Sequence, residues 1–317
     1  MPIRGIMKKP LVVACVIVVI CSLITVSILL KQPADTSQGN PESTPTATPQ
    51  STLQPTPQNT TQPTPQATPT TTPQPTPNGQ LPETAIQQAI DKAIENLKAT
   101  EQPYCLLMLN VIYRQFGIAE FNDTLQRYDH LLAANSDPTL RVFRRMAAYN
   151  NTVNASDFNA IADPINRLTY PALYADKITP PTNYPATLQS ARESGGYQIT
   201  HALLATIWLN NNHCTLQFPN NFLQSLYHDT AALTQCGSIV TDINFEAAAF
   251  LCEAGQGSLV DQGFLQKVLD TQNYDGGWLG SSDQPGASYW HSSVLALMYL
   301  LYVEYPAVSY PPMIPSA

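Results

Sequence analysis

Basic residues are scarce in this chain of 317 residues: 15 Lys and Arg stand against 23 Asp and Glu, for a formal net charge of −8. They form no cluster in the sequence. A protein that binds nucleic acid needs a basic stripe facing the phosphates, so no nucleic-acid partner is expected. The sequence also lacks a Gly-rich phosphate loop, a Gly-x-Ser-x-Gly elbow and a His-Glu-x-x-His helix, which argues against the enzyme classes built on those motifs.

Charge is missing altogether from residues 11–30. A helix of this length spans about 30 Å, the thickness of the hydrocarbon core of a bilayer. Arg4, Lys8 and Lys9 precede the run and only Lys31 follows it closely, so the positive-inside rule predicts a cytoplasmic tail at 1–10, a single transmembrane anchor at 11–30 and everything later outside the cell. A cleaved signal peptide is the alternative, but its apolar region is normally shorter.

Residues 31–80 lack the apolar side chains of a packed core. In 32–80, 35 of 49 residues are Pro, Thr or Gln, which predicts a disordered, extended linker with a reach on the order of 150 Å. Such Thr-Pro density is typical of glycosylated stalks. The rest of the chain, 81–317, is one globular domain. N-glycosylation sequons are found at Asn59, Asn122, Asn150 and Asn154.

Residues 81–317 show no convincing strand pairs, and their apolar period is helical. Ile86, Ile90, Ile94 and Leu97 share one helix face, which predicts a helix over 83–99. We expect an irregular loop over 170–184. Further helices are predicted at 104–116, 123–134, 138–149, 156–168, 197–210, 220–234, 242–252, 262–270 and 289–302. This is an all-α domain in which short connections join antiparallel neighbours.

The last third of the chain repeats itself. Gly195-Gly196 leads into a helix that carries His201, and Gly276-Gly277 leads into one that carries His291. The two histidines are 90 residues apart, and the helix predicted at 242–252 begins near the midpoint. Units of about 45 residues, each with one helix pair, indicate a stacked or closed helical array.

Two motifs resemble a known superfamily. Residues 272–278, Gln-Asn-Tyr-Asp-Gly-Gly-Trp, are similar to the glutamine–tryptophan repeat of squalene cyclases. Asp-Gln-Pro-Gly at 283–286, followed by Tyr-Trp-His at 289–291, resembles the last repeat of protein prenyltransferase β-subunits. The resemblance covers about 193–304 and implies an α/α-toroid of helical hairpins, in which an outer ring of helices wraps an inner ring. The predicted helices make about five hairpins, whereas six close a toroid.

The resemblance also implies a metal site. In prenyltransferase β-subunits, an Asp-x-Cys pair and a later histidine bind zinc, and Asp242 and His291 match two of these ligands. Asn244 stands where the cysteine should be, and an amide oxygen is a poor zinc ligand. His201 could substitute only if the helices bring it close. Otherwise His201 and His291 are hydrogen-bonded wall residues, and no cofactor is bound.

A glycan hydrolase or lyase is a second possibility, because α/α-barrels also carry such sites. It needs two carboxylates about 5–10 Å apart across a cleft. Asp242 and Glu246 are four residues apart on one helix face, and Asp275 is a further catalytic candidate. The alternative is that these acids are simply solvated. The aromatic residues available to bind a sugar or another ligand are Tyr197, Trp278 and Trp290.

The toroid implied by the resemblance bears on the cysteines outside the anchor. Cys214 and Cys252 each follow an inner helix of successive units, so they could meet at one rim as a disulfide. Three pairings of Cys105, Cys214, Cys236 and Cys252 are conceivable, and buried free thiols are the alternative.

Together these features favour a single-pass cell-surface glycoprotein whose extracellular domain binds a glycan or protein ligand. The domain is prenyltransferase-like and squalene cyclase-like in fold but lacks the full catalytic motif. The sequence leaves open whether it is an enzyme. The competing hypotheses are a cell-surface enzyme that acts on polysaccharide, a zinc-dependent activity at Asp242 and His291, and a structural component without a ligand.

Overall fold

The computed structural model describes residues 84–280, 288–307 and 309–316. These residues contain twelve α-helices, three short 3-10 helices and no β-strand, so the prediction of an all-α domain is confirmed. The predicted anchor, the linker and the sequon at Asn59 lie outside the described residues. Within the described ranges, no helix combines the length and the apolar character needed to cross a membrane.

Short connections join the helices along the chain. The α-helices are α1 (Ala85–Leu97), α2 (Pro103–Phe116), α3 (Thr124–Ala133), α4 (Pro138–Phe143), α5 (Ala155–Ala160), α6 (Pro164–Leu173), α7 (Tyr184–Ser194), α8 (Tyr197–Asn211), α9 (Phe222–Ala232), α10 (Asp242–Glu253), α11 (Phe264–Asp270) and α12 (Trp290–Glu304). The 3-10 helices are η1 (Ala119–Phe121), η2 (Arg144–Met146) and η3 (Gly257–Leu259).

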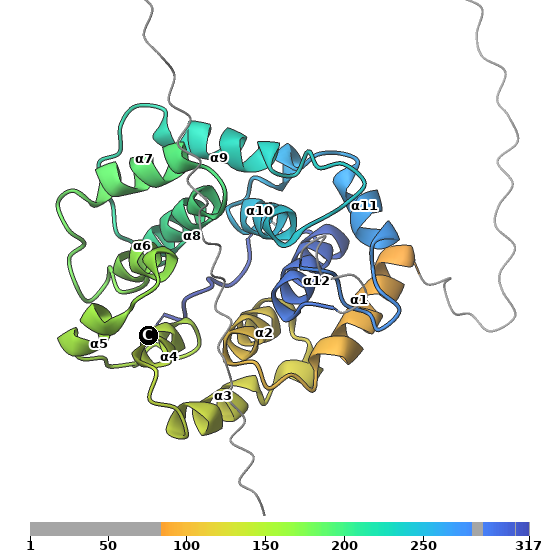
Figure 1. The fold of residues 1–317 in the computed structure, drawn as a ribbon, viewed down its shortest axis with the longest axis horizontal. Helices are drawn as coiled ribbons and strands as arrows, with labels where there is room; N and C mark the ends of the chain where they lie inside the picture. Colours follow the sequence, from red (N-terminus) through yellow and green to blue (C-terminus); the bar gives the residue numbers. More distant parts are fainter. Residues whose placement is uncertain (1–83, 281–287, 308, 317) are drawn as a thin grey trace, which may run out of the picture. The chain divides into compact units, whose positions relative to one another are not determined.

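The even-numbered helices stand around the centre of the domain, and the odd-numbered helices stand outside them (Figure 1). Each inner helix packs against the next in the order α2, α4, α6, α8, α10 and α12, and α12 packs back against α2. Outside them, α3 packs on α2, α5 on α4, α7 on α8, and α9 on both α8 and α10. The first helix, α1, packs against the last helix, α12, so the beginning and the end of the domain lie together.

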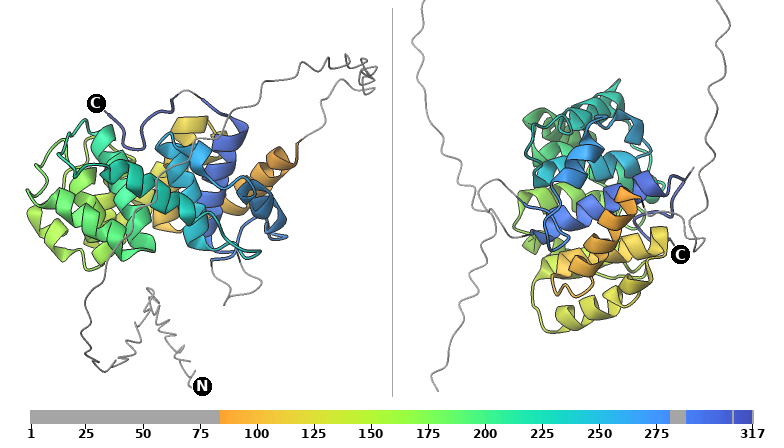
Figure 2. Two further views of the ribbon diagram at one scale, coloured as in Figure 1. Left: turned by 90° about the horizontal axis from the view of Figure 1, so that it is seen from above. Right: turned by 90° about the vertical axis from the view of Figure 1, so that its right-hand side faces the viewer.

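Helices α8, α10 and α12 all begin at one end of this arrangement and finish at the other. Tyr197 opens α8, and its hydroxyl donates to Asp242, which opens α10, over 2.9 Å. At the opposite end, the amide of Gln115 near the end of α2 donates to Glu253, the last residue of α10, over 2.8 Å. We call the first end the mouth and the second end the base. Residues 309–316 run along the base (Figure 2).

The turn that carries the squalene cyclase-like motif is held between helices. Gly276 has a φ of 89°, and a Cβ there would lie 2.2 Å from the carbonyl oxygen of Lys92 in α1, so the position requires glycine. Trp278 follows and is fully buried, with its indole nitrogen donating to the carbonyl oxygen of Val268 over 2.8 Å. Trp278 therefore anchors this turn in the core of the domain.

Three parts of the predicted helix pattern were wrong. The helix predicted over 138–149 ends as α4 at Phe143, and η2 follows it. The other two failures lie further along the chain. The helix predicted over 156–168 is split into α5 and α6, because Pro164 starts a new helix that Asp163 caps by accepting from the backbone nitrogen of Ile165 over 2.7 Å. The region predicted as a loop over 170–184 contains the end of α6, and helix α7 was missed. These two errors account for the missing hairpin.

Candidate functional site

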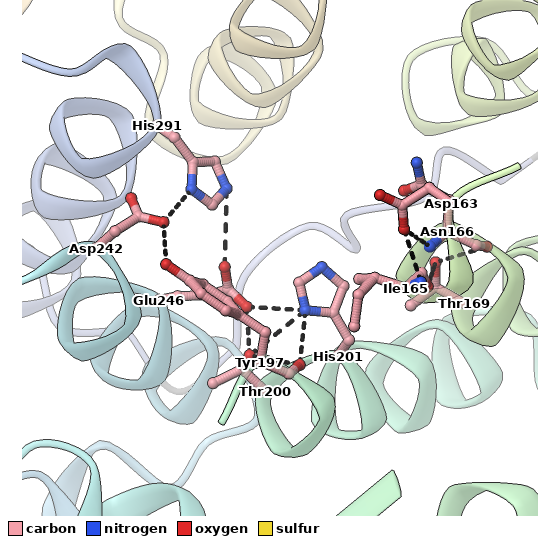
Figure 3. Close-up of polar contacts among 10 residues, drawn as sticks. All are labelled: Asp163, Ile165, Asn166, Thr169, Tyr197, Thr200, His201, Asp242, Glu246 and His291. Carbon is pink, nitrogen blue, oxygen red and sulfur yellow. Dashed lines mark hydrogen bonds and ion pairs between the residues drawn. The ribbon is translucent and has the colours of Figure 1, made fainter. Parts of the chain in front are cut away.

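The mouth brings together polar side chains from the first turns of three inner helices. Tyr197 and His201 come from α8, Asp242 and Glu246 from α10, and His291 from α12. Figure 3 shows these side chains pointing toward one another. All five were singled out from the sequence, and the structure places them in one cluster, which we call the mouth cluster.

Asp242 is the most tightly held member of the mouth cluster. Its Oδ2 accepts from the Tyr197 hydroxyl over 2.9 Å and from His291 Nδ1 over 2.8 Å, and its Oδ1 accepts from the Ser292 hydroxyl over 2.7 Å. The residue is buried. Burial opposes ionisation, but the charge of His291 and these hydrogen bonds outweigh it and lower the pKa of Asp242. Asp242 is therefore ionised.

His291 links Asp242 to the second carboxylate. Burial disfavours its charged form, yet the Asp242 carboxylate outweighs burial and raises the pKa of His291 to about 9. Its Nδ1 is taken by Asp242, whereas its Nε2 lies 3.7 Å from Glu246 Oε2. About a quarter of the His291 side chain is exposed, so this ring forms part of the accessible wall of the mouth.

Glu246 carries the one unsatisfied oxygen of the cluster. Its side chain is fully buried. Oε1 accepts from the Thr200 hydroxyl and lies 3.0 Å from His201 Nδ1. Oε2 has no hydrogen-bond partner among the described residues. Its nearest charged neighbour there is His291 Nε2, 3.7 Å away, and a buried carboxylate oxygen without a hydrogen bond is costly.

His201 is held through its Nδ1. Its Nδ1 lies 3.0 Å from the carbonyl oxygen of Tyr197, which can only accept, and 3.0 Å from Glu246 Oε1, so Nδ1 carries a hydrogen. Figure 3 shows Nε2 on the side of the ring away from α8. The ring is therefore positioned by its own helix and by the buried glutamate.

Aromatic side chains flank the mouth cluster. Tyr197 is 39% exposed, and burial of its remaining surface together with the charge of Asp242 raises its pKa above the ordinary value. The ring of Trp290 lies 5.1 Å from that of His291, centroid to centroid, and is half-buried. These two rings are therefore partly exposed beside the mouth cluster.

Two residues proposed from the sequence are not in the cluster. Asp275 lies in the turn before Trp278, where its Oδ1 accepts from the backbone nitrogen of Gly277 over 3.1 Å and from the Ser288 hydroxyl over 2.5 Å. Trp278 is fully buried in the core, beside Phe245, so it cannot act as a stacking platform. The motif that carries both residues has a structural role in this turn.

The carboxylates and His291 offer a set of ligand atoms that lie within 4.8 Å of one another. Glu246 Oε2 and His291 Nε2, 3.7 Å apart, are near the separation of about 3.3–3.5 Å between two ligands of a tetrahedral zinc ion. The hydrogen bond from His291 Nδ1 to Asp242 is the second contact that metal-binding histidines usually make. The residues present therefore fit a divalent cation.

Asn244, at the position of the missing cysteine ligand, does not contribute. Its side chain closes a capping box, in which Oδ1 accepts from the backbone nitrogen of Thr241 over 2.7 Å and Nδ2 donates to the carbonyl oxygen of Leu233 over 2.7 Å. Glu246, and not Asn244, lies with Asp242 and His291 in the set of potential ligand atoms. Thr200 and Ser292, which also bind the two carboxylates, were not predicted, because an isolated hydroxyl in a helix gives no sequence signal.

The remaining predicted positions lie away from the mouth cluster. Cys214 and Cys252 are free thiols, as are Cys105 and Cys236, so the predicted disulfide is not formed in this structure. Cys252 Sγ lies against η3, where a Cβ on Gly257 would be 3.1 Å from it. The three described sequon residues are exposed: Asn122, Asn150 and Asn154.

Comparisons with protein-family models, with curated proteins and with solved structures find no match for this chain.

Proposed function

We propose that this protein is a membrane-anchored enzyme of the cell surface that uses a divalent cation held in the mouth cluster. The observation that carries the proposal is the buried Glu246 Oε2, which has no hydrogen-bond donor and lies 3.7 Å from His291 Nε2. A cation between these two atoms would pair with the orphaned oxygen. Asp242 already orients His291, and Thr200 and His201 orient Glu246.

The fold assigned with this function is an α/α-toroid. Its support is the succession of inner helices that closes from α12 back to α2, the outer helices packed on them, and the motifs at 272–278 and 289–291. The anchor at 11–30, the spacer at 31–80 and the glycosylation of exposed sequons belong to the same proposal, on the sequence patterns given above. They would place the mouth outside the cell and away from the bilayer.

The number and kind of ligands favour a catalytic metal over a structural one. Structural zinc sites are closed by four ligands and are rich in cysteine, whereas catalytic sites keep a position open. Here Glu246 and His291 supply two ligand atoms, with Asp242 as the partner of the histidine or as a third ligand. Mixed nitrogen and oxygen donors suit zinc, manganese or iron better than calcium or magnesium.

Hydrolysis is the reaction class that this arrangement supports best. A bound divalent cation would supply Lewis acidity and would lower the pKa of a water molecule. The chain's own groups supply the remainder: His201 lies beside the buried Glu246, and the Tyr197 hydroxyl lies beside Asp242. The exposed part of Tyr197 and the ring of Trp290 would bind the substrate. Polysaccharide remains the substrate class that we expect.

Ligand binding without catalysis is the second candidate, because two aromatic rings, Tyr197 and Trp290, border the mouth. Without a metal, His291 is positively charged between two carboxylates, since its pKa is raised to about 9. A floor of hydrogen-bonding groups beside aromatic rings suits a glycan. In this candidate Glu246 Oε2 has only the ion pair with His291 Nε2 over 3.7 Å and no hydrogen bond, so we place it second.

Metal stoichiometry tests the proposal directly. The full-length protein in detergent, dialysed against zinc or manganese, should retain about one ion per chain, as a single catalytic site requires. Glu246→Gln should lose this ion while keeping its circular dichroism spectrum. Glu95→Gln changes an exposed carboxylate on α1 and should retain it.

An activity screen then separates the two candidates. Chromogenic glycosides, esters and phosphoesters should be hydrolysed only with the metal present, and Glu246→Gln should abolish turnover. Folded protein that binds neither metal would contradict the metal centre. Glycan binding by that metal-free protein would then favour the second candidate.

A further inference from the structure

Residues 309–316 form a strap across the base of the domain. Arg114, near the end of α2, donates to the carbonyl oxygens of Pro312 and Met313 over 2.9 and 2.6 Å. The side chains of Met313 and Ile314 are buried. The strap is therefore held both by charge-assisted hydrogen bonds to its backbone and by apolar packing.

Three side chains of the inner helices join the strap to α10. Gln115 Nε2 donates to the carbonyl oxygen of Pro311 over 2.8 Å and to Glu253 Oε2 over 2.8 Å. The Tyr302 hydroxyl lies 2.9 Å from Gln115 Oε1 and is also hydrogen-bonded to Glu253 Oε2. These hydrogen bonds join Gln115, Tyr302 and Glu253 in a closed triangle. The strap is bonded to this triangle at Gln115.

The orientation of the Gln115 amide follows from the strap. The carbonyl oxygen of Pro311 can only accept a hydrogen bond, so the NH₂ group of Gln115 must face it. The same NH₂ group faces Glu253, and Oε1 is left to face Tyr302. This leaves no freedom to exchange the two amide atoms.

The triangle needs a proton that an ionised Glu253 does not have. Tyr302 has one hydroxyl hydrogen and two oxygen neighbours, Gln115 Oε1 and Glu253 Oε2. If Glu253 is ionised, one of these contacts brings two oxygen lone pairs together with no hydrogen between them. If Glu253 is protonated, it donates to Tyr302, Tyr302 donates to Gln115, and every contact contains one hydrogen.

We propose that Glu253 is a proton-operated latch for the strap: the protonated carboxyl fastens residues 309–316 across the base, and its ionisation loosens them. The strap would therefore open as the pH rises. This device is independent of the mouth cluster and of the function proposed for it.

The surroundings of Glu253 favour the protonated form near neutral pH. Burial raises the pKa of Glu253 to about 7, although the hydrogen bonds of Tyr302 and Gln115 and the charge of Arg114 oppose it. Glu253 is also the last residue of α10, where the helix dipole disfavours a negative charge. The pKa of the neighbouring Cys252 thiol is raised to about 12, mainly by burial, so it adds no charge near neutral pH.

Water can reach the latch. A cavity of about 590 Å³ lies between the strap and the ends of α8, α10 and α12, and Glu253 and Tyr302 line it. The other titratable groups that line this cavity, or the neighbouring one at Glu253, come from the loop after α8, from α9 and from the strap. They are His213, Cys214, Tyr227 and Tyr310.

Hydrogen exchange of the strap tests the latch in the full-length protein. After correction for intrinsic exchange, protection of residues 309–316 should fall by about tenfold between about pH 5.5 and about pH 8.5, since one pKa unit corresponds to a tenfold change. Glu253→Gln cannot ionise, so protection of its strap should not change across this pH range. Glu304→Gln, which changes another carboxylate near the end of α12, should behave as the unmodified protein does.

Tyr302→Phe provides a second test. It removes the hydroxyl that connects Glu253 to Gln115 and leaves the Glu253 carboxyl in place. Its strap should be weakly protected even at about pH 5.5, where Glu253 is protonated. Equal protection of the strap in the unmodified protein and in Glu253→Gln across this pH range would overturn the proposal. So would a pH dependence that persists unchanged in Glu253→Gln.

Discussion

The two ends of α10 hold carboxylates in opposite states. At the mouth, Asp242 is ionised and Glu246 has an oxygen with no donor. At the base, Glu253 shares hydrogen bonds with Tyr302 and Gln115 beneath a strap of the same chain. The direction of the helix explains part of this contrast, because its N-terminus favours negative charge and its C-terminus disfavours it.

The difference also teaches which end is built to meet a ligand. At the base, Gln115, Tyr302 and Glu253 Oε2 all have hydrogen-bond partners within the chain. At the mouth, the side chains of His291 and Tyr197 are partly exposed above a buried, unsatisfied oxygen. An incomplete polar cluster is costly unless something completes it, whereas a complete one contributes to stability.

Asp242→Asn should give the largest effect, at the mouth. The asparagine cannot hold His291 Nδ1 as the carboxylate does, so affinity for the divalent cation should fall by about 10–100-fold. A competition titration of zinc against a chromogenic chelator measures this loss. Glu95→Gln is the matched surface control. An unchanged affinity in Asp242→Asn would show that Asp242 does not support cation binding, and the contrast between the two ends would then be wrong.

Arg114→Lys should weaken the attachment of the strap to the base of the domain. The guanidinium bridges the carbonyl oxygens of Pro312, Met313 and Met146, and an ammonium cannot reproduce this fork. We expect a loss of about 1–2 kcal/mol in the free energy of unfolding, measured by urea denaturation. Cation binding at the mouth should be unaffected, and a loss of affinity there would show that the two ends are coupled.

Glu253→Gln should change how stability depends on pH. Because the folded pKa of Glu253 is about 7, above its ordinary value, its stabilising contribution is full below the ordinary pKa and is lost as the pH rises through about 7. Between about pH 5 and about pH 8, the melting temperature of the unmodified protein should therefore fall by about 2–4 °C relative to that of the variant. Thermal denaturation followed by circular dichroism measures both melting temperatures. The same difference between the two proteins at both pH values would contradict the prediction.

Asp275→Asn should have the smallest effect. Its Oδ1 accepts two hydrogen bonds in the turn before Trp278, and an asparagine oxygen can accept both. Cation affinity should be unchanged, and stability should change by less than about 0.5 kcal/mol. A clear loss of cation binding, measured by the titration used for Asp242→Asn, would show that Asp275 contributes to the functional site.

Much of the helix pattern could be predicted, because the apolar period and the caps are local features. Helix α1 follows the spacing of Ile86, Ile90 and Ile94, and α10 follows its capping box. The failures at α5 to α7 share a cause: proline-rich segments end and restart helices, and a proline at the first turn of a helix resembles a loop in the sequence.

The composition of the mouth cluster could be anticipated in part. The repeat singled out His201 and His291, and the i, i+4 spacing paired Asp242 with Glu246. The same motifs also pointed to Asp275 and Trp278, which the structure places in a turn and in the core. Sequence patterns locate a motif, but they do not distinguish a side chain that faces a ligand from one that holds its own loop.

The sequence by itself determined that the domain is all-α, that acidic residues outnumber basic ones, and which polar residues begin the inner helices. These properties follow from composition and from contacts within a few residues. Tertiary structure alone decided that Glu246 Oε2 lacks a donor and that Gln115, Tyr302 and Glu253 share a proton beneath the strap. Such contacts join residues up to 187 positions apart, and their state depends on burial and on the hydrogens that neighbouring helices supply.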